Sequence, residues 1–438
     1  MNYSSKIISL EKALSLVKDN DTIVTGLGAC ESGLFMENLH TLAGKVKNIR
    51  IVNCIPTHDC AFYRPEYADT FEVDGWFYTT SMRKAHEQGN MTYIPNHLHF
   101  CAEKWLYRNH PDIFVCSASM PDKNGYISIA TSCTYERRIM EKADIVILEI
   151  NPNYPFVYGD VVIHYSEADY LLEADNPIPI WPDVPFSERD EVIGRIIADY
   201  VPDGACIQLG IGGIPNAVAE CLKSKNDLGV HTELITTKMM ELAKMGVITN
   251  SRKQINKGQM IATMILGTRE LFEFADHNPG VALFDGAWVN NPHTIAQNDN
   301  QISINTSLEV DLTGQCASES IGSRHFSGTG GQSDTAIGSQ MSKNGRSIIA
   351  LYSTAMVRNP VTGERQEVSK IVPQLQPGAA VTLHRSDVDL VITEYGVADL
   401  RGANIKERVK SLINIAHPKF RDELMDQAVR FGIIGRRL

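Results

Sequence analysis

The chain has 438 residues, of which 43% are hydrophobic and 21% are charged, and its net charge is −11 at pH 7. This length predicts two domains, and the composition is that of a soluble globular protein. The acidic balance offers no basic stripe for nucleic acid or anionic lipid. No apolar run approaches the roughly 20 residues of a membrane span. We therefore expect neither a nucleic-acid partner nor a membrane, and a polyanionic ligand needs a local basic pocket or backbone N–H groups.

The nine cysteines and the N-terminus indicate the compartment. The cysteines are scattered, odd in number and without a C-x-x-C pair. Disulfides and structural zinc are therefore not expected, and a reducing cytoplasm fits. Residues 1–20 carry several charges within an amphipathic pattern, which is not the pattern of a signal peptide. The sequence predicts a cytoplasmic protein.

A segment near the N-terminus returns in the middle of the chain. Residues 17–28 match residues 201–212 without a gap, and Val, Asp, Ile and both glycines coincide. Each copy predicts a turn, a buried strand, a glycine loop and a new helix. An amphipathic helix precedes each copy, and before the second copy Ser187 is its expected N-cap.

Weaker similarities follow in the same order. Residues 122–125 resemble 311–314, and residues 143–149 resemble 388–394. Residues 115–119 and 126–130 have the pattern of a hairpin across the first of these turns.

The four prolines of segment 175–185 prohibit a helix and favour an extended linker. We place the domain boundary there, with lobes 1–186 and 187–438. Helices that alternate with short Val/Ile-rich strands predict an α/β protein with a mainly parallel sheet in each lobe. The expected fold is two similar open-sheet lobes with an active-site cleft between them.

Two glycine loops can approach an anion. Gly26-x-Gly28 and Gly210-x-Gly212-Gly213 both depart from G-x-G-x-x-G, because Glu31 and Pro215 occupy the last glycine position. A nicotinamide dinucleotide fold is therefore disfavoured, and a tight strand-to-helix turn is the alternative for the first loop. Pro215 suits a first helical turn, and the N–H groups of the second loop can face a developing negative charge.

Glu233 is the leading candidate for catalysis. It follows the second glycine loop, within the apolar, β-prone run 228–235. The carboxyl ends of neighbouring parallel strands face one crevice, so this position aims an acid at whatever the loop binds. The ordinary alternative is a solvated surface acid. A third glycine cluster, 326–334, is short and bordered by patterned sequence, which favours a functional loop over a flexible linker.

Several motifs in one order resemble the acetyl-CoA hydrolase/transferase family, most closely its 4-hydroxybutyrate and butyrate CoA-transferase branch. They extend over essentially the full chain and occupy residues 155–160, 210–218, 231–233, 289–292, 327–332, 369–373, 391–398, 400–402 and 412–418. The resemblance implies a ping-pong CoA-transferase that uses CoA as a substrate, without a metal or a permanently bound cofactor. Its substrates would be acyl-CoA and short-chain carboxylates, such as acetyl-CoA with 4-hydroxybutyrate or butyrate. A homodimer is the base-rate expectation.

The resemblance also implies roles for particular residues. Glu233 is the covalent nucleophile, which passes through an acyl-glutamyl anhydride and a glutamyl-CoA thioester. Asn290 orients it or donates to an oxyanion. Further oxyanion or CoA contacts are expected from Gln208, Gly212, Gly213, Gly328, Gly330, Gly331 and Lys370. Lys370 and Arg401 are candidate phosphate contacts, with exposed surface cations as an equal alternative.

Some positions depart from the family pattern and leave acyl specificity open. Residues 236–238 are Thr-Thr-Lys where the family usually has Ser-Asp-Gly, and Asn291 stands where the family has a histidine. Thr335 follows Asp334, where the family favours Phe. An acyl-CoA hydrolase on the same scaffold and a non-catalytic CoA-binding protein remain alternatives. A metal site at His58, Asp59, His97 and His99 is disfavoured, because no further ligand stands at zinc-like spacing.

Overall fold

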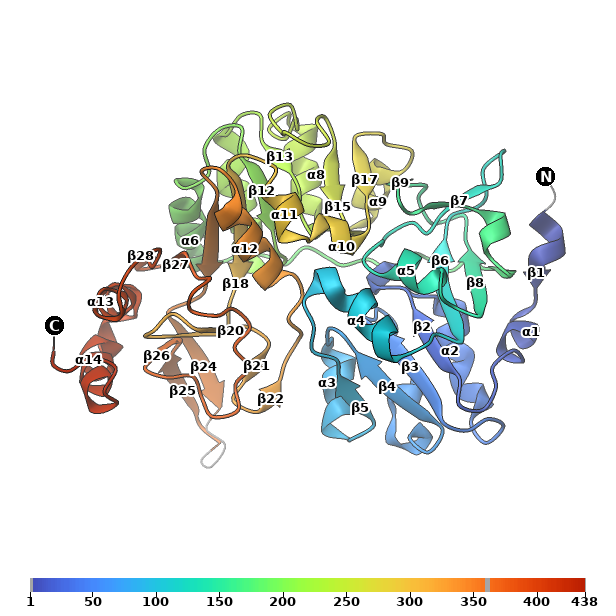
Figure 1. Ribbon diagram of the computed structural model, residues 1–438, viewed down its shortest axis with the longest axis horizontal. Helices are drawn as coiled ribbons and strands as arrows, with labels where there is room; N and C mark the ends of the chain where they lie inside the picture. The colour runs from blue at the N-terminus through green and yellow to red at the C-terminus, as the bar shows by residue number, and fades with distance from the viewer. Residues whose placement is uncertain (1–2, 359–362, 438) are drawn as a thin grey trace. The chain divides into compact units, whose positions relative to one another are not determined.

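Short runs rich in Val and Ile form the strands of two mainly parallel sheets in the computed structural model, which describes residues 3–358 and 363–437 (Figure 1). The contacts within the chain define two compact units. Unit 1 consists of Met1–Pro182, Thr232–Met240 and Gln259–Asn291, and unit 2 of Asp183–His231, Glu241–Gly258 and Pro292–Leu438. The chain therefore returns twice to unit 1 after it has entered unit 2.

Unit 1 is built on an eight-stranded sheet in which every neighbouring pair is parallel. Its strands, in spatial order, are β1 (Ile7–Ile8), β11 (Tyr170–Glu173), β8 (Ile145–Ile150), β6 (Ile113–Ala118), β2 (Thr22–Thr25), β3 (Ile49–Asn53), β4 (Phe71–Gly75) and β5 (Met91–Tyr93). Strand β6 is buried along its whole length, as expected for a central parallel strand covered on both faces.

Helices pack on this sheet through a core that includes Ile23, Ile51 and Ile113 from the strands and Phe35 and Met36 from α2. The helices of unit 1 are η1 (Tyr3–Lys6), α1 (Leu10–Leu14), η2 (Gly28–Cys30), α2 (Gly33–Asn38), η3 (Leu39–Leu42), η4 (Ala61–Tyr63), η5 (Pro65–Tyr67), α3 (Thr80–Glu87), η6 (Leu98–Phe100), α4 (Cys101–Arg108), α5 (Glu136–Met140), η7 (Tyr165–Glu167), α9 (Arg269–Ala275) and α10 (Gly286–Val289). Helix α8 (Thr237–Lys244) begins in unit 1 and ends in unit 2.

Three smaller sheets complete unit 1. An antiparallel pair joins β7 (Tyr126–Ser128) and β10 (Val162–His164), and parallel sheets join β14 (Leu234–Ile235) to β16 (Met264–Ile265) and β15 (Met260–Ala262) to β17 (Val281–Leu283) and β9 (Tyr158–Gly159). The last sheet explains why residues 259–291 belong to unit 1, since β17 pairs with a strand that precedes it by more than a hundred residues.

Unit 2 has a six-stranded sheet that is parallel except at its last pair, β27 with β28. The spatial order is β13 (Gly229–Val230), β12 (Cys206–Leu209), β18 (Gln301–Thr306), β23 (Arg346–Ala350), β27 (Leu390–Thr393) and β28 (Gly396–Asp399). Short sheets are formed by β20 (Cys316–Ala317), β19 (Glu309–Asp311) and β26 (Ile371–Val372), by β21 (Ser320–Ile321) and β22 (Arg324–His325), and by β24 (Thr354–Arg358) and β25 (Arg365–Ser369). The helices are α6 (Glu188–Ala198), α7 (Gly213–Cys221), η8 (Leu222–Ser224), α11 (Pro292–Ile295), α12 (Gln332–Met341), α13 (Ile405–Ile415), η9 (Pro418–Phe420) and α14 (Arg421–Arg430).

The two sheets share one order of parallel strands, which confirms the prediction of two similar α/β lobes. The order β11-β8-β6-β2-β3 in unit 1 corresponds to β27-β23-β18-β12-β13 in unit 2. Strands β2 and β12 occupy the same positions of the predicted repeat. The turns that begin at Asp122 and Asp311 also correspond, because each aspartate accepts backbone N–H groups two and four residues later.

Several local predictions are confirmed. Helix α6 begins after Ser187 with a capping box to Asp190, and segment 175–185 contains neither helix nor strand. Two other predictions are wrong. The similarity of 143–149 to 388–394 relates β8 to β27, whereas the sheet order relates β8 to β23. The predicted hairpin forms no strand ladder, since β6 pairs with the parallel strands β2 and β8 while β7 pairs with β10, although the N–H of Ser119 donates to the carbonyl of Ser128 across the turn.

The division into units differs from the predicted lobes at the segments that return to unit 1. The chain first enters unit 2 after Pro182, close to the predicted boundary at 186, but residues 232–240 lie in unit 1. Glu233 is thus grouped with the N-terminal sheet, because packing rather than chain order defines each unit. No helix within the described ranges combines the length and apolar character needed to cross a membrane.

Candidate active site

Glu233 is held in a short connection that precedes β14. Its carbonyl oxygen accepts hydrogen bonds from the N–H groups of Thr263 (3.0 Å) and Met264 (3.1 Å). The N–H of the preceding Thr232 donates to the carbonyl of Ile261, so neighbouring backbone groups anchor the connection to the segment 261–264. The Glu233 residue itself is partly exposed. A fixed backbone with an accessible carboxylate suits a nucleophile.

Asn290 is brought directly to Glu233. Its Nδ2 donates to Glu233 Oε2 at 3.1 Å, and the residue is only 1% exposed. Asn290 is the C-cap of α10, whose first turn is closed by the Asp285 side chain accepting from the N–H of Ala287. Asp285 is itself oriented by Arg138 at 2.7 Å. The short helix therefore delivers one amide to one carboxylate oxygen.

The loop 131–134 holds both partners in position. The N–H of Cys133 donates to the carbonyl of Thr263, and the N–H of Gly286 donates to the carbonyl of Cys133. The approach is so close at Gly286 that an added Cβ would lie 2.5 Å from the Thr134 carbonyl oxygen. These four buried residues carry no sequence signal that marks them as part of a site.

The first glycine loop lies in the same region of unit 1. The N–H of Gly28 donates to the carbonyl of Cys54 at 3.2 Å. Burial raises the pKa of the Cys54 thiol well above its ordinary value, and the negative charge of Glu233 adds to that rise. The next residue, Ile55, has φ +50°, a strained conformation for a β-branched side chain. Backbone strain of this kind often accompanies functional sites.

Glu31 fixes the turn that follows Ile55. Its Oε2 accepts the N–H groups of Thr57 (3.0 Å) and His58 (3.2 Å), while its Oε1 is buried without a hydrogen-bond partner in the described part of the chain. Burial raises the pKa of Glu31 to about 7, against the counteracting charge of His58. Sequence reasoning missed this acid, because a glutamate in a glycine loop has the pattern of a solvated residue.

In unit 2, the structure connects Gln208 to the third glycine cluster. Gln208 Nε2 lies 3.5 Å from Asn305 Oδ1, and Asn305 Nδ2 donates to Thr335 Oγ1 at 3.0 Å. Thr335 stands in the first turn of α12, which the loop 328–331 precedes. Asn305 belongs to β18, the parallel neighbour of β12. Sequence reasoning missed Asn305, since only strand pairing reveals its position.

The glycines of unit 2 adopt conformations that suit exposed N–H groups. Gly212 has φ +122° and is the N-cap of α7, which begins at Gly213. Gly330 has φ +54°, and Gly331 is the N-cap of α12, whereas Gly328 is buried. The first N–H groups of a helix have no intrahelical acceptor, so both helix starts can receive an anion. Their predicted roles stay predictions.

The two candidate phosphate cations already have acidic partners. Lys370 Nζ forms a buried ion pair with Glu309 at 3.2 Å. Arg401 donates to both oxygens of Asp389, which also accepts two hydrogen bonds from Arg346. These contacts give both cations a structural function, and their phosphate contacts stay predictions.

The departures at 236–238 lie at the start of α8. Thr237 Oγ1 accepts the N–H of Thr268 at 3.1 Å and would lie 2.5 Å from a Cβ at position 267. The threonines are buried, and Lys238 is partly exposed. They pack α8 against the segment that follows β16.

Within the described ranges, His110, Asp112 and Asp144 could together hold a metal ion. Two of them are exposed, and Asp112 also accepts the N–H of Thr22. Of the histidines considered from the sequence, His58 pairs with Glu37 at 2.9 Å, and the rings of His97 and His99 stack 6.3 Å apart.

Comparison with known proteins matches most of the chain to the two domains of one family. Residues 1–182 match the acetyl-CoA hydrolase/transferase N-terminal domain and residues 267–428 match its C-terminal domain. The chain is 39% identical to a succinyl-CoA:cyclohexane-1-carboxylate CoA transferase of Geobacter metallireducens, over 99% of this chain and 97% of that protein. It is 38% identical to a 4-hydroxybutyrate coenzyme A transferase of Clostridium kluyveri, over 97% of each. The crystal structure of RipA from Yersinia pestis superposes with a TM-score of 0.90 at 34% identity, over 99% of both chains.

The fold and these matches define an enzyme of the CoA-transferase class. The chain belongs to the acetyl-CoA hydrolase/transferase family, which confirms the resemblance found in its motifs. CoA is the carrier that this family handles.

Proposed function

We propose that this enzyme moves CoA between a short-chain acyl-CoA and a free carboxylate by a ping-pong mechanism with Glu233 as the nucleophile. The hydrogen bond from Asn290 Nδ2 to Glu233 Oε2 is the single observation that carries the proposal. It places a donor at the carboxylate oxygen where charge later develops. A permanently bound cofactor has no part in the cycle.

In the first half-reaction, Oε1 attacks the thioester carbonyl of the acyl-CoA. The C–S bond breaks, CoA leaves as a thiolate, and Glu233 becomes a mixed acyl-glutamyl anhydride. The thiolate then attacks the glutamyl carbonyl, the free carboxylate departs, and a glutamyl-CoA thioester remains. An acceptor acid reverses both steps, so no atoms or electrons are left over.

Asn290 has its largest effect when CoA thiolate attacks the glutamyl carbonyl. That carbonyl oxygen is the former Oε2, which already accepts the Asn290 amide at 3.1 Å. The negative charge of the tetrahedral intermediate therefore grows on an atom with a donor in place. Preorganised donors of this kind typically lower a barrier by about 3–4 kcal/mol.

The residues of unit 2 complete the proposal. The N–H groups of Gly212, Gly213, Gly328, Gly330 and Gly331, and the amide of Gln208, are assigned to the thioester oxyanion or to CoA. This part is supported by the two helix starts without a side-chain cap and by the link from Gln208 through Asn305 to α12.

The relatives guide the choice of acids. One relative is named for 4-hydroxybutyrate, one for butyrate with acetyl-CoA, and one for cyclohexane-1-carboxylate with succinyl-CoA, so we propose 4-hydroxybutyrate or butyrate as the substrate of this enzyme, with acetyl-CoA as donor. We also propose that it acts in the cytoplasm as a homodimer, on base rates alone. Hydrolysis by water of the same covalent intermediate is the second candidate, because the family name includes acetyl-CoA hydrolases.

The test is the intact mass of the protein after brief incubation with acetyl-CoA, compared between the wild type and Glu233→Gln. A CoA-sized adduct on the wild type only, with exchange of CoA into acetate, supports the transferase. Release of free CoA without exchange supports the hydrolase. An adduct of equal size on Glu233→Gln would refute the assignment of the nucleophile.

A further inference from the structure

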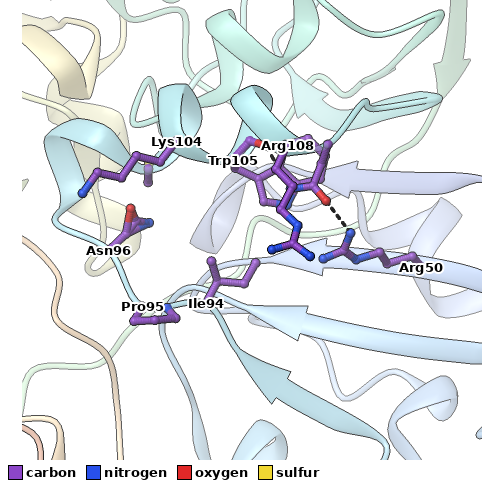
Figure 2. Close-up of a pocket in the computed structure, with 9 residues that line it drawn as sticks. Arg50, Ile94, Pro95, Asn96, Lys104, Trp105 and Arg108 are labelled. Atoms are coloured by element: carbon purple, nitrogen blue, oxygen red, sulfur yellow. Dashed lines mark hydrogen bonds between the residues drawn. The ribbon is translucent and has the colours of Figure 1, made fainter.

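A separate pocket of about 370 Å³ lies in unit 1 between β3, the segment that follows β5 and the helix α4 (Figure 2). Its size is at the lower end of the roughly 300–1,000 Å³ typical of ligand sites. It can take part of a nucleotide, but not the whole of CoA. Its lining residues are Arg50, Ile94, Pro95, Asn96, Cys101, Lys104, Trp105, Arg108 and Asn109.

The pocket is positively charged in a chain whose net charge is −11. Arg50 is neutralised and oriented by its ion pair with Asp74, and its Nη1 donates to Asn109 Oδ1 at 2.6 Å. In Figure 2, Arg50 and Arg108 extend toward the same part of the pocket. Because Asp74 already offsets the charge of Arg50, the unmatched positive charge of the pocket comes from the other cations of its lining.

Helix α4 adds two cations to this wall, one turn apart. Arg108 is exposed and makes neither a hydrogen bond nor an ion pair with any described residue, and Lys104 Nζ lies 5.1 Å from the centre of the Phe100 ring. Neither charge is therefore matched by an acid in the described part of the chain. This differs from Lys370 and Arg401, both of which have acidic partners.

Two buried polar atoms of the lining have no hydrogen-bond partner within the described residues. They are the indole N–H of Trp105, whose side chain is 3% exposed overall, and Oδ1 of Asn96. Leaving such atoms unpaired costs about 1–3 kcal/mol each. An unpaired hydrogen-bond donor and an unpaired acceptor lie beside two cations that have no acidic partner in the described ranges. This combination indicates a polar, anionic ligand.

The pocket is close to the catalytic residues of unit 1. Lining residue Cys101 directly follows η6, and η6 packs against α10. Helix α10 ends at Asn290, the donor to Glu233. The helices η6 and α10 therefore connect the pocket to Asn290 and the proposed nucleophile.

We propose that this pocket binds the phosphate groups of a nucleotide, held by Lys104 and Arg108, the two lining cations without an acidic partner among the described residues. Guanidinium and ammonium groups are the usual partners of phosphate. Two kinds of molecule carry such phosphate groups. One is CoA, through its 3′-phosphorylated ADP end, and the other is a free adenine nucleotide that acts as an effector. The CoA source rests on the proposed function, whereas the free-nucleotide source does not.

The experiment measures binding of CoA, dephospho-CoA, adenosine 3′,5′-bisphosphate and ADP to the full chain by titration calorimetry, without turnover. Binding to the wild type is compared with that to Lys104→Ala/Arg108→Ala. Lys123→Ala/Lys142→Ala, two exposed cations outside the pocket, is the control with the same loss of charge. The KM and kcat for acetyl-CoA are measured on the same proteins.

We expect the pocket variant to weaken nucleotide binding at least tenfold while the control changes less than twofold. If the KM for acetyl-CoA rises in parallel with unchanged kcat, CoA is the ligand. If ADP binding is lost while binding of CoA and adenosine 3′,5′-bisphosphate is unchanged, the ligand is a free nucleotide. The proposal is overturned if the pocket variant binds all four compounds as the control does. Because binding is measured directly, a protein that transfers no CoA would refute the proposed function without deciding this one.

Discussion

The substitution Glu31→Gln is expected to remove a pH dependence from the stability of the protein. Glutamine keeps an oxygen for the N–H groups of Thr57 and His58, so the turn after Ile55 retains both hydrogen bonds. It adds an amide N–H where Oε1 is buried without a partner among the described residues. The variant therefore resembles the protonated wild type at every pH.

The magnitude follows from the pKa of Glu31, which burial raises from an ordinary 4.5 to about 7. Between these values the folded protein holds a proton that the unfolded chain has lost, so the free energy of unfolding falls as pH rises. At about 1.4 kcal/mol for each pKa unit, ionised Glu31 costs about 3 kcal/mol above pH 7, and the cost vanishes below pH 4.5. Glu31→Gln should thus gain up to about 3 kcal/mol relative to the wild type between pH 4.5 and 8.

The assay is urea unfolding followed by circular dichroism at several pH values, for the wild type, Glu31→Gln and Glu173→Gln. Glu173 is an exposed acid at the end of β11, and its substitution should leave the pH profile parallel to that of the wild type. The difference in the free energy of unfolding between Glu31→Gln and the wild type at each pH separates the effect of Glu31 from that of the other buried acids. A difference that stays constant from pH 4.5 to 8 would refute the assignment of a raised pKa.

Three further substitutions test the site and its support. Asn290→Ala should lower kcat about 10²–10³-fold with little change in CoA binding, measured by steady-state exchange; an unchanged kcat would contradict an oxyanion role. Gly286→Ala places a Cβ 2.5 Å from the Thr134 carbonyl oxygen and should lower kcat by displacing α10 and Asn290, whereas Gly435→Ala, which meets no atom within 4 Å and has no positive φ, is the control for replacing a glycine. Lys370→Met leaves Glu309 buried and unpaired and should cost about 3–5 kcal/mol in urea unfolding without raising the KM for acetyl-CoA. A raised KM with unchanged stability would restore its phosphate role.

The parts of the fold that the sequence predicted are those encoded by short contiguous runs. Strands β2 and β12 are found because a turn, a Val/Ile run and a glycine loop recur at one spacing. The N-cap at Ser187 is likewise local. The similarity of 143–149 to 388–394 misled for the same reason, since any buried strand that ends in an acid has that pattern.

The parts that escaped prediction depend on strands that meet in space. Asn305 reaches Gln208 only because β18 and β12 are parallel neighbours. The grouping of Glu233 with unit 1 depends on β14 pairing with β16, and residues 259–291 join the same unit through β17 and β9. No spacing along the chain reveals these pairings.

Three glutamates of unit 1 show why sequence position alone cannot identify a nucleophile. Glu149 and Glu233 both lie within or beside Val/Ile-rich runs, and Glu136 follows a buried loop. Glu136 is fully buried and accepts the N–H groups of Leu27 and Tyr135, and burial raises its pKa.

Glu149 accepts the Ser32 hydroxyl and the N–H of Leu34 through Oε2, and burial raises its pKa as well. Such acids are fully buried and close loops, so a substrate cannot reach them. Glu233 differs because it is partly exposed and its Oε2 accepts a neutral amide donor. A partly exposed acid with a donor at one carboxylate oxygen is what the proposed covalent transfer of CoA requires.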